Sequence, residues 1–530
     1  MKLTYIASTY PTPEFPFFGA RIAVEEVTAD VKVERAELNG VWDRDVWAFN
    51  DGECDRKETL YAGSYNELRI RTDWTAGQEC TLKFNFTDGT EETVSFTANG
   101  EGSRPLPEFK YYAGVVITNP SKIDRVHEPV RQPMAVYADR IQDPYKEVRV
   151  VEIQPETGAM KEIPCQITNV SSWEEFADEH CQPTANFDVI FMASVKAFDK
   201  RVYLVFYGNP EAEKPVYESA LKISGEGLKR TIENEYYAIN LHDLSGGIDE
   251  VTVKQGVNQT FAHHLETNGT MNWSPDIYAP PTPWNHISDW DPPENWEFEV
   301  GPVCITMRRW GTMPMYDDVR ISVTYEFYEG YRPILVTTTM ELTKDRDIIA
   351  LRGGEVVINR ELANEIAWRN MDGSIDLVHA DDLPRHPTMG KRLPATTPWV
   401  ALLNSEKEAA LGVSYIDYSS ICTEGGVPRL DSHLYVHVGF WIYVARPLLY
   451  TFVGNNPQRV MRAKAGTLHY EKHAWHPMHI QTFRDDAFEE LEDATEALKL
   501  PLQRQVFLDT DNRVPTEWIP PFLLAEFIEI

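Results

Sequence analysis

Residues 234–251 read NEYYAINLHDLSGGIDEV, and this stretch decides the fold class. Residues 234–241 form a strand-like run, Ser245, Gly246 and Gly247 follow, and a second strand-like run begins at Ile248. A glycine turn between two such runs indicates a hairpin. The stretch therefore predicts antiparallel β-structure.

Similar strand-like runs lie on both sides of this hairpin. Asp88-Gly89 separates two of them and is a turn signal. Further runs occur at 27–33, 82–86, 92–96, 111–118, 148–153, 189–195, 201–207, 319–328, 334–341, 348–357, 399–403 and 434–444. Helix signals are few: Ser172 and Glu175 form a capping box at 172–177, and a helix is expected over 485–500. We expect an all-β protein with few helices.

The length of 530 residues predicts several domains. Pro105 and Pro107 mark a boundary, and the larger β region begins after Pro215. The predicted order is an immunoglobulin-like β-sandwich at 1–105, a second β-sandwich at 106–221, a large antiparallel supersandwich of two stacked sheets at 222–484, and a C-terminal helix and extended tail at 485–530. From Gln503 the tail is predicted to be a packing strand or an arm.

The charge balance excludes several classes of partner. The chain has 50 Lys and Arg against 82 Asp and Glu, a formal net charge of −32, which opposes binding to nucleic acid and to anionic membranes. Residues 1–5 lack the apolar core of a secretory signal, so a cytoplasmic location is expected. A periplasmic or secreted location applies if a leader has been removed, and a homo-oligomer is compatible with the sequence.

Residues 222–482 resemble the galactose-mutarotase-like supersandwich of bacterial polysaccharide lyases and several glycosidases. The resemblance rests on 236–251, on the segment 264–290 and on the strand 301–311. FYGNP at 206–210 is also similar to a strand end of accessory sandwiches in carbohydrate-active proteins. The resemblance implies a carbohydrate-active enzyme with an oligosaccharide or glycoside substrate. The chain departs from many such lyases because it has no helical stretch for an (α/α) toroid, so a site must lie in the β-domains.

Residues 258–296 combine tryptophans and histidines with prolines. Because proline interrupts helices and central strands, we expect a long loop that displays its aromatic rings. Indole faces stack on sugar rings, and polar neighbours bind the hydroxyls. The predicted substrate-binding residues of this segment are His263, Trp273, Asp276, Trp284, Asn285, Asp289 and Trp290.

Residues 433–443 alternate strictly and form the second predicted part of the site. As one strand, this segment would display on a single face the residues His433, Tyr435, His437, Gly439, Trp441 and Tyr443. Such a face is typical of the floor of a polar pocket. We expect this strand and the 258–296 segment to meet in one cavity.

β-Elimination from a uronic acid needs a base, an acid and a group that neutralises the carboxylate. The base and acid are expected among His264, His286, His437 and Tyr443. Arg309 and Asn285 are the expected carboxylate ligands. His263 and His264 point to opposite faces of an extended chain, so only one reaches the site, with a slight preference for His264.

Three alternatives remain open from the sequence. A glycoside hydrolase would pair Asp276 or Asp289 with Glu365. A non-catalytic protein would bind a glycan through the same aromatic residues. No cofactor motif is present, but a divalent metal is possible because one face of an extended segment would carry His469, Glu471 and His473.

Overall fold

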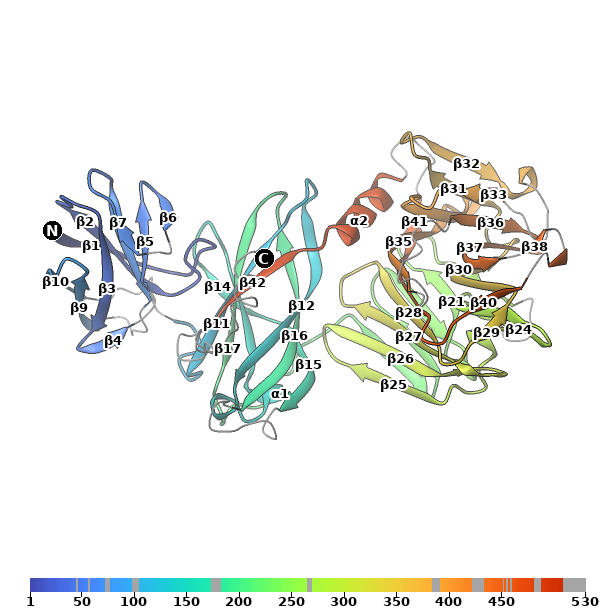
Figure 1. The fold of residues 1–530 in the computed structure, drawn as a ribbon, viewed down its shortest axis with the longest axis horizontal. Coiled ribbons are helices and arrows are strands. Elements are labelled where there is room, and N and C mark those ends of the chain that lie inside the picture. The colour runs from blue at the N-terminus through green and yellow to red at the C-terminus, as the bar shows by residue number, and fades with distance from the viewer. Residues whose placement is uncertain are drawn as a thin grey trace. The chain divides into compact units, whose positions relative to one another are not determined.

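The computed structural model describes residues 1–43, 46–55, 58–71, 77–97, 104–172, 183–264, 269–383, 391–421, 433–450, 452–453, 456–457, 460–480 and 488–508. The chain forms two compact units: unit 1 comprises Met1–Val216 and Leu502–Ile530, and unit 2 comprises Tyr217–Pro501. Figure 1 labels their strands and helices. The described residues are almost entirely β-structure, with two short α-helices, which confirms the predicted class. The four-part division at 105, 221 and 484 stays a prediction.

The first part of unit 1 is a sandwich of two sheets. One sheet has the order β1 (Lys2–Thr9), β2 (Gly19–Glu25), β8 (Asn66–Arg71), β5 (Val46–Asn50) and β6 (Glu53–Asp55). The other contains β10 (Glu91–Thr97), β9 (Glu79–Phe86), β3 (Val31–Leu38) and β4 (Val41–Asp43), with β7 (Thr59–Leu60) also on β3. Strands β9 and β10 flank Asp88-Gly89, which confirms the predicted hairpin. Gly89 has a φ of 83°, a conformation that favours glycine.

The second part of unit 1 is another sandwich. Its larger sheet has the order β14 (Met160–Ile163), β13 (Arg149–Ile153), β17 (Lys200–Tyr207), β11 (Tyr111–Thr118) and β42 (Gln503–Phe507). Its smaller sheet contains β12 (Arg125–Tyr137), β16 (Thr184–Val195) and β15 (Cys165–Ser172). The connection from β12 to β13 contains the 3₁₀ turn η2 (Ala138–Arg140) and the helix α1 (Pro144–Glu147). The helix predicted at 172–177 lies outside the described residues except for Ser172, which ends β15.

Strand β42 comes from the far end of the sequence. It pairs antiparallel with β11, with Gly114 opposite Phe507 and Thr118 opposite Gln503. The Phe507 ring lies 6.1 Å from Phe17 and 5.7 Å from Trp47, between ring centres. Residues 503–507 therefore form a packing strand, one of the two predicted forms of the tail, and the tail after residue 508 lies outside the described residues.

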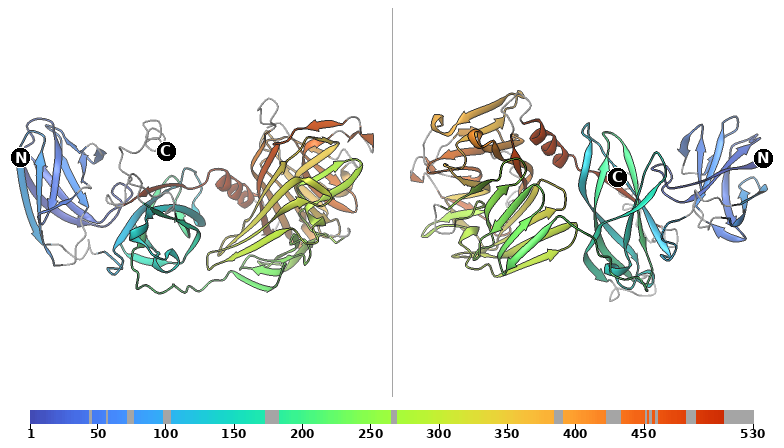
Figure 2. Two further views of the ribbon diagram at one scale, coloured as in Figure 1. Left: turned by 60° about the horizontal axis from the view of Figure 1, so that its bottom comes forward. Right: turned by 180° about the vertical axis from the view of Figure 1, so that it is seen from behind.

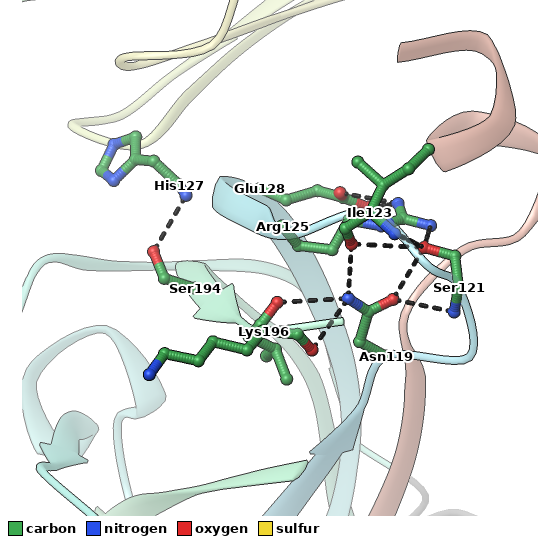
Figure 3. Close-up of polar contacts among 9 residues, drawn as sticks. Asn119, Ser121, Ile123, Arg125, His127, Glu128, Ser194 and Lys196 are labelled. Carbon is green, nitrogen blue, oxygen red and sulfur yellow. Dashed lines mark hydrogen bonds and ion pairs between the residues drawn. The ribbon is translucent and has the colours of Figure 1, made fainter. Parts of the chain in front are cut away.

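A buried polar cluster fixes one end of the second sandwich (Figure 3). The Asn119 side chain donates to the carbonyls of Ile123, at 2.7 Å, and Lys196, at 3.0 Å. Arg125 pairs with Glu128 at 2.8 Å, across a bulge in β12. Burial raises the pKa of Glu128, and the charge of Arg125 opposes that shift. These contacts hold the bulge against the β16–β17 turn.

Unit 2 contains three larger sheets (Figure 2). The first has the order β18 (Lys222–Glu226), β19 (Lys229–Glu233), β20 (Tyr237–Leu241), β21 (Ile248–Val253) and β22 (Gln259–Ala262). The six-stranded sheet has the order β24 (Thr282–His286), β23 (Asp276–Ala279), β30 (Ala350–Asn359), β37 (Trp441–Tyr450), β36 (Leu434–Val438) and β33 (Lys391–Leu393). The hairpin predicted at 234–251 is the β20–β21 pair.

The third sheet of unit 2 has nine strands. Its order is β25 (Asn295–Val300), β26 (Cys304–Met313), β27 (Tyr316–Tyr328), β28 (Ile334–Leu342), β41 (Leu468–His479), β35 (Ala409–Ile421), β34 (Trp399–Asn404), β31 (Glu365–Arg369) and β32 (Ile375–His379). Two short pairs join β29 (Arg346–Ile348) to β40 (Met461–Ala463) and β38 (Phe452–Val453) to β39 (Asn456–Pro457). The 3₁₀ turns are η4 (Ile287–Asp289), η5 (Ala380–Asp382) and η6 (Ser405–Lys407).

One hydrophobic core joins the three sheets, and a helix covers part of the nine-stranded sheet. The core includes Ile239, Val356, Leu411 and Trp475. Helix α2 (Glu489–Lys499) lies within the predicted helix at 485–500 and buries Leu491 in a separate apolar cluster of the nine-stranded sheet. No helix in the described part of the chain is both long and apolar enough to cross a bilayer.

Two predicted elements are wrong in form. Residues 258–296 are not one long loop, because they contain β22, β23, β24 and η4. Pro283 is compatible with β24 because β24 is an edge strand, where a missing N–H costs little. Residues 433–443 form the β36–β37 hairpin rather than one strand. The turn after Val438 keeps the parity, so His437 and Tyr443 face each other across the hairpin and still share one face.

Candidate active site on the six-stranded sheet

The two segments predicted to form the site meet on one face of the six-stranded sheet. Val356 and Ile358 of β30 point into the core of unit 2, whereas Val357 packs on the opposite face with Trp273 and Tyr443. This alternation follows from the pleat of a strand. Across the β24–β23–β30 register, Asp276 lies opposite both His286 and Arg352, which continues a row of polar side chains along that face.

Trp273 is the centre of the cluster. Its ring centre lies 5.1 Å from His286 in a stacked arrangement and 5.1 Å from His263 edge to face. It also lies 6.1 Å from Trp441 and 6.3 Å from Tyr443. Separations of 4.5–7 Å are typical of favourable aromatic pairs. One indole therefore joins the segment 258–296 to the hairpin 433–443.

Arg352 holds the polar part of the cluster together. Its Nε donates to both Asp276 oxygens, at 3.0 and 2.9 Å, and lies 3.3 Å from Glu355. Its Nη1 donates to the hydroxyls of Tyr435 and Tyr443, both at 3.0 Å. Burial lowers the pKa of Arg352, but the charges of Asp276 and Glu355 outweigh that effect and raise it. Asp276 and Glu355 are fully buried, so Arg352 is their counter-charge.

His286 is oriented by its own turn. Its backbone N–H donates to Oδ2 of Asp289 at 3.0 Å, and its Nδ1 lies 3.3 Å from the same oxygen. Ser288 Oγ also contacts Nδ1. Burial lowers the pKa of His286, and the charges of Asp289 and Asp276 oppose the shift in part. The result is a neutral imidazole beside a carboxylate, with 17% of the side chain exposed, which suits a general base.

The pKa of Tyr443 is shifted upward, whereas that of His286 is shifted downward. Burial raises the pKa of its phenol, and the charge of Arg352 opposes that shift. Its hydroxyl lies 3.2 Å from that of Tyr435, and its ring centre lies 4.9 Å from the His437 ring. Tyr443 therefore keeps its proton at neutral pH while two hydrogen bonds polarise it, which suits a general acid.

The rim of the cluster carries an exposed aromatic ring and an exposed cation. Trp284 is 37% exposed, stacks on Tyr278 at 5.1 Å, and lies 4.6 Å from the guanidinium of Arg352. Arg392 on the edge strand β33 is exposed and lies directly opposite Tyr435. Directly opposed residues share one face of a sheet, so Arg392 borders the cluster.

The structure separates the two adjacent histidines. His263 is fully buried and contacts Trp273, whereas the His264 side chain is 49% exposed and lies 3.4 Å from Glu250. The expected alternation of faces is observed, with His263 rather than the preferred His264 in the cluster. Burial lowers the pKa of His263 to about 4.

Several other predicted site residues lie elsewhere. Arg309 is fully buried on β26 of the nine-stranded sheet, where it donates to Tyr325 Oη at 2.8 Å and to the Ser245 carbonyl. Trp290 is buried in the core and donates to the Thr312 carbonyl at 2.8 Å. A guanidinium enclosed in this way cannot reach a substrate on the six-stranded sheet.

Three further predicted residues, Asn285, His433 and Glu365, lie on β24, just before β36 and on β31. The Asn285 side chain donates to the Pro283 carbonyl at 3.2 Å and points toward Met315, on the other side of β24 from His286. His433 is half-buried just before β36. Glu365 lies on β31 of the nine-stranded sheet and accepts from the Ser405 N–H at 3.1 Å, so it does not pair with Asp276.

The three predicted metal ligands do share one side of β41 but do not form a metal site. Among the described residues, no group of three or more His, Cys, Asp or Glu could hold a metal ion. His469 bonds Ser420 Oγ at 2.7 Å, and Glu471 pairs with Arg446 at 3.3 Å. Burial raises the pKa of Glu471 and lowers that of His473 to about 3.

Three site residues were missed from the sequence: Arg352, Glu355 and Arg392. Arg352 and Glu355 stand in the otherwise apolar strand ALRGGEVVIN, and a charged residue in a buried strand is a signal that could have been used. Gly354 has a φ of 58°, and its bulge brings Glu355 close to the face. Arg392 has no local sequence signal, because it stands in the short segment KRL with no distinctive pattern.

Comparisons with known proteins found similarity to solved structures only. No protein-family profile and no curated protein matches the chain. A solved α-mannosidase from Enterococcus faecalis matches 76% of this chain and 46% of its own, at 11% identity and a TM-score of 0.47. A glycosyl hydrolase family 38 protein from the same organism matches 76% of this chain and 48% of its own, at 12% identity and 0.43. This chain thus spans about half the length of both.

A galactose mutarotase-like protein from Lactobacillus casei matches 47% of this chain and 99% of its own, at 9% identity and a TM-score of 0.29. Similarity at this level leaves the activity of this chain to be argued from its own residues. The groups that the structure brings together on the six-stranded sheet are a neutral imidazole, a protonated phenol, indole rings and a rim guanidinium.

Proposed function

We propose that this protein is a carbohydrate-active enzyme that cleaves a uronate-containing oligosaccharide by β-elimination on the six-stranded sheet of unit 2. The observation that carries the proposal is that the ring centre of Trp273 lies 5.1 Å from His286 and 6.3 Å from Tyr443. A candidate base and a candidate acid thus share one aromatic neighbour, which supports a site for a sugar.

In this proposal His286 is the base. Asp289 holds Nδ1, so Nε2 keeps its lone pair and can take the proton at C5 of the uronate. Tyr443 gives its proton to the leaving glycosidic oxygen, and Arg352 then stabilises the phenolate. The C5–H bond and the C4–O bond break, and a C4–C5 double bond forms without an external reagent.

Arg392 is assigned to the carboxylate of another uronate of the oligosaccharide, because β24 and β33 are the two edges of the six-stranded sheet, about 24 Å apart at about 4.8 Å per strand. Arg309 is enclosed in the other sheet, and Arg352 is already paired with Asp276 and Glu355. Arg392 is an exposed cation on the face of Tyr435. A guanidinium binds a carboxylate through two parallel hydrogen bonds, which also fixes the orientation of the ring.

The test is incubation with a panel of uronate-containing oligosaccharides while ultraviolet absorbance reports the unsaturated product. We expect His286→Ala and Tyr443→Phe each to reduce the rate by about 10²- to 10⁴-fold. His264→Ala is the matched control, because this neighbouring imidazole is exposed and lies outside the cluster. Reducing ends without unsaturation would assign a hydrolase instead.

A glycan-binding protein without turnover is the second candidate. It is favoured over turnover because Trp273, Tyr435 and Tyr443 are each at most 6% exposed, so that a glycan would contact the rim ring of Trp284, which is 37% exposed. In that case no panel member is cleaved, and His286→Ala changes affinity by less than about threefold, since one rim contact contributes under 1 kcal/mol. Cleavage of any substrate by the wild type but not by His286→Ala contradicts this candidate.

A further inference from the structure

Unit 2 also has a cleft beside the proposed site, and the proposed elimination does not use it. The cleft, of about 610 Å³, opens between the residues after η4 and the β26–β27 turn. Its lining includes Asp289, Trp290, Asp291, Glu294, Met315 and Asp317. The volume is that of a pocket for one or two sugar rings.

The cleft shares a residue with the proposed base. Asp289 lines the cleft and also accepts the His286 N–H at 3.0 Å. β24 is the edge strand of its sheet, with His286 on the cluster side and Asn285 on the side of Met315. An oligosaccharide that meets His286 with one ring can therefore place its next ring around the edge of the sheet.

The charge of the cleft selects its ligand. Four carboxylates line it, and none of the described lining residues is a lysine or arginine. Hydrogen bonds from Thr312 lower the pKa of Glu294, so this carboxylate is ionised at neutral pH. The Asp317 side chain is 86% exposed, and Lys344 lies 3.7 Å from it, outside the lining. Such a cleft repels a second uronate and attracts a cation.

The walls of the cleft suit the apolar face of a ring. Met313 and Tyr316 are buried at its base. Met315, in the left-handed conformation at φ 63°, is 69% exposed in the turn. A thioether adapts its shape to an irregular ligand.

We propose that this cleft is a sugar subsite for the residue that flanks the reacting uronate, and that it takes an amine-bearing sugar in preference to an uncharged one and excludes an anionic one. The inference rests on the proposed function for the identity of the reacting ring, but the cleft and its charge are independent of that chemistry. The substrate class is then an oligosaccharide that joins a uronate to an amino sugar.

Calorimetry on the full chain with three trisaccharides tests the subsite: those of glucosamine, N-acetylglucosamine and galacturonate. We expect Asp291→Asn combined with Asp317→Asn to weaken glucosamine trisaccharide binding by about five- to tenfold, because two attractive charges are lost. In the same double variant the affinity for N-acetylglucosamine trisaccharide should change by less than twofold. Galacturonate trisaccharide should bind the double variant more tightly than it binds the wild type. Glu361→Gln with Glu406→Gln is the control, because these two acids are exposed and lie outside the cleft.

Met315→Trp gives a steric test that does not depend on charge. The larger ring at the mouth should abolish binding of the glucosamine and N-acetylglucosamine probes. Equal affinity of the wild type and the double variant for glucosamine trisaccharide, or unchanged binding in Met315→Trp, overturns the subsite.

The two proposals fail separately. Cleft-dependent binding that persists in His286→Ala, with no unsaturated product from any substrate, rejects the elimination and leaves the subsite. Elimination that is unaffected by all cleft variants rejects the subsite and leaves the elimination.

Discussion

Two buried arginines of unit 2 differ in what surrounds them. Arg352 on the six-stranded sheet contacts two carboxylates and two phenols. Arg309 on the nine-stranded sheet bonds Tyr325 and a carbonyl, and among the described residues no carboxylate pairs with it. Burial lowers the pKa of Arg309, with an opposing effect of Tyr325, whereas the net effect on Arg352 is a raised pKa.

Register explains the difference. Arg352 lies opposite Asp276, whereas Arg309 lies opposite Trp296 and Val323. Arg352 stands in a fully buried strand and Arg309 in a strand whose burial alternates, but which residues lie opposite them cannot be read from either strand alone. A buried cation at the centre of an acidic and aromatic cluster organises a site, and one between aromatic rings fills a core.

The largest expected effect is on stability, and it separates the two arginines. Arg352→Met leaves Asp276 and Glu355 buried without a counter-charge, which should cost about 3–5 kcal/mol of unfolding free energy. Arg309→Met exchanges two hydrogen bonds for a lower desolvation cost, so its loss should stay below about 1.5 kcal/mol. Urea unfolding with peptide-resolved hydrogen exchange of β30 and β26 measures both changes.

A double variant sharpens this comparison. Adding Asp276→Asn to Arg352→Met removes one buried carboxylate that has lost its counter-charge. The double variant should therefore regain at least about 1 kcal/mol of unfolding free energy relative to Arg352→Met alone. Equal losses for Arg352→Met and Arg309→Met, or no recovery in the double variant, would show that the carboxylates are not what distinguishes the two positions.

Acid should weaken unit 2 next most strongly. Burial lowers the pKa of His263 and His469 to about 4 and of His473 and His476 to about 3, against 6.5 in the unfolded chain. Between those values the unfolded state binds more protons, so the unfolding free energy falls as the pH falls, by up to about 1.4 kcal/mol per pH unit for each histidine. Glu471, whose pKa is raised by burial, acts in the opposite sense.

Urea midpoints between pH 7 and pH 4 measure this slope. His473→Phe is the informative variant, because neither ring nitrogen of His473 has a hydrogen-bond partner among the described residues. It should reduce the slope without unfolding unit 2. A slope that stays the same in His473→Phe contradicts the assignment of that proton.

The smallest expected effect concerns the rim of the site. Arg392→Gln should raise KM for a uronate substrate by about tenfold and leave stability unchanged, because it removes one exposed charge-assisted contact. Arg308→Gln, an exposed arginine on the nine-stranded sheet, is the matched control and should change neither quantity. Equal KM values for the two variants would remove Arg392 from the site.

The sequence predicted local structure better than it predicted neighbours. Alternation and turn residues correctly indicated the all-β class, the hairpin at Asp88-Gly89 and the strand beyond Gln503. The same reasoning missed the turn after Val438, because three residues separate the paired Val438 and Ile442, and an odd number of turn residues preserves the parity of an alternating pattern.

The site residues show the same difference between local structure and neighbours. The structure brings together Trp273, His286 and Tyr443, which local composition had selected. Arg309 was selected for its residue type and lies in the other sheet, while Arg352 was overlooked. Pairing between distant strands fixes which arginine meets Asp276, and no short window of sequence contains that pairing.

Strand β42 makes unit 1 discontinuous along the chain, and this bears on its biosynthesis. β11 leaves the ribosome early, whereas its partner arrives only after all of unit 2 has been translated. Until then β11 presents a bare edge of N–H and C=O groups, the kind of surface on which nascent chains aggregate. A truncated gene that stops before Gln503 would make that transient hazard permanent.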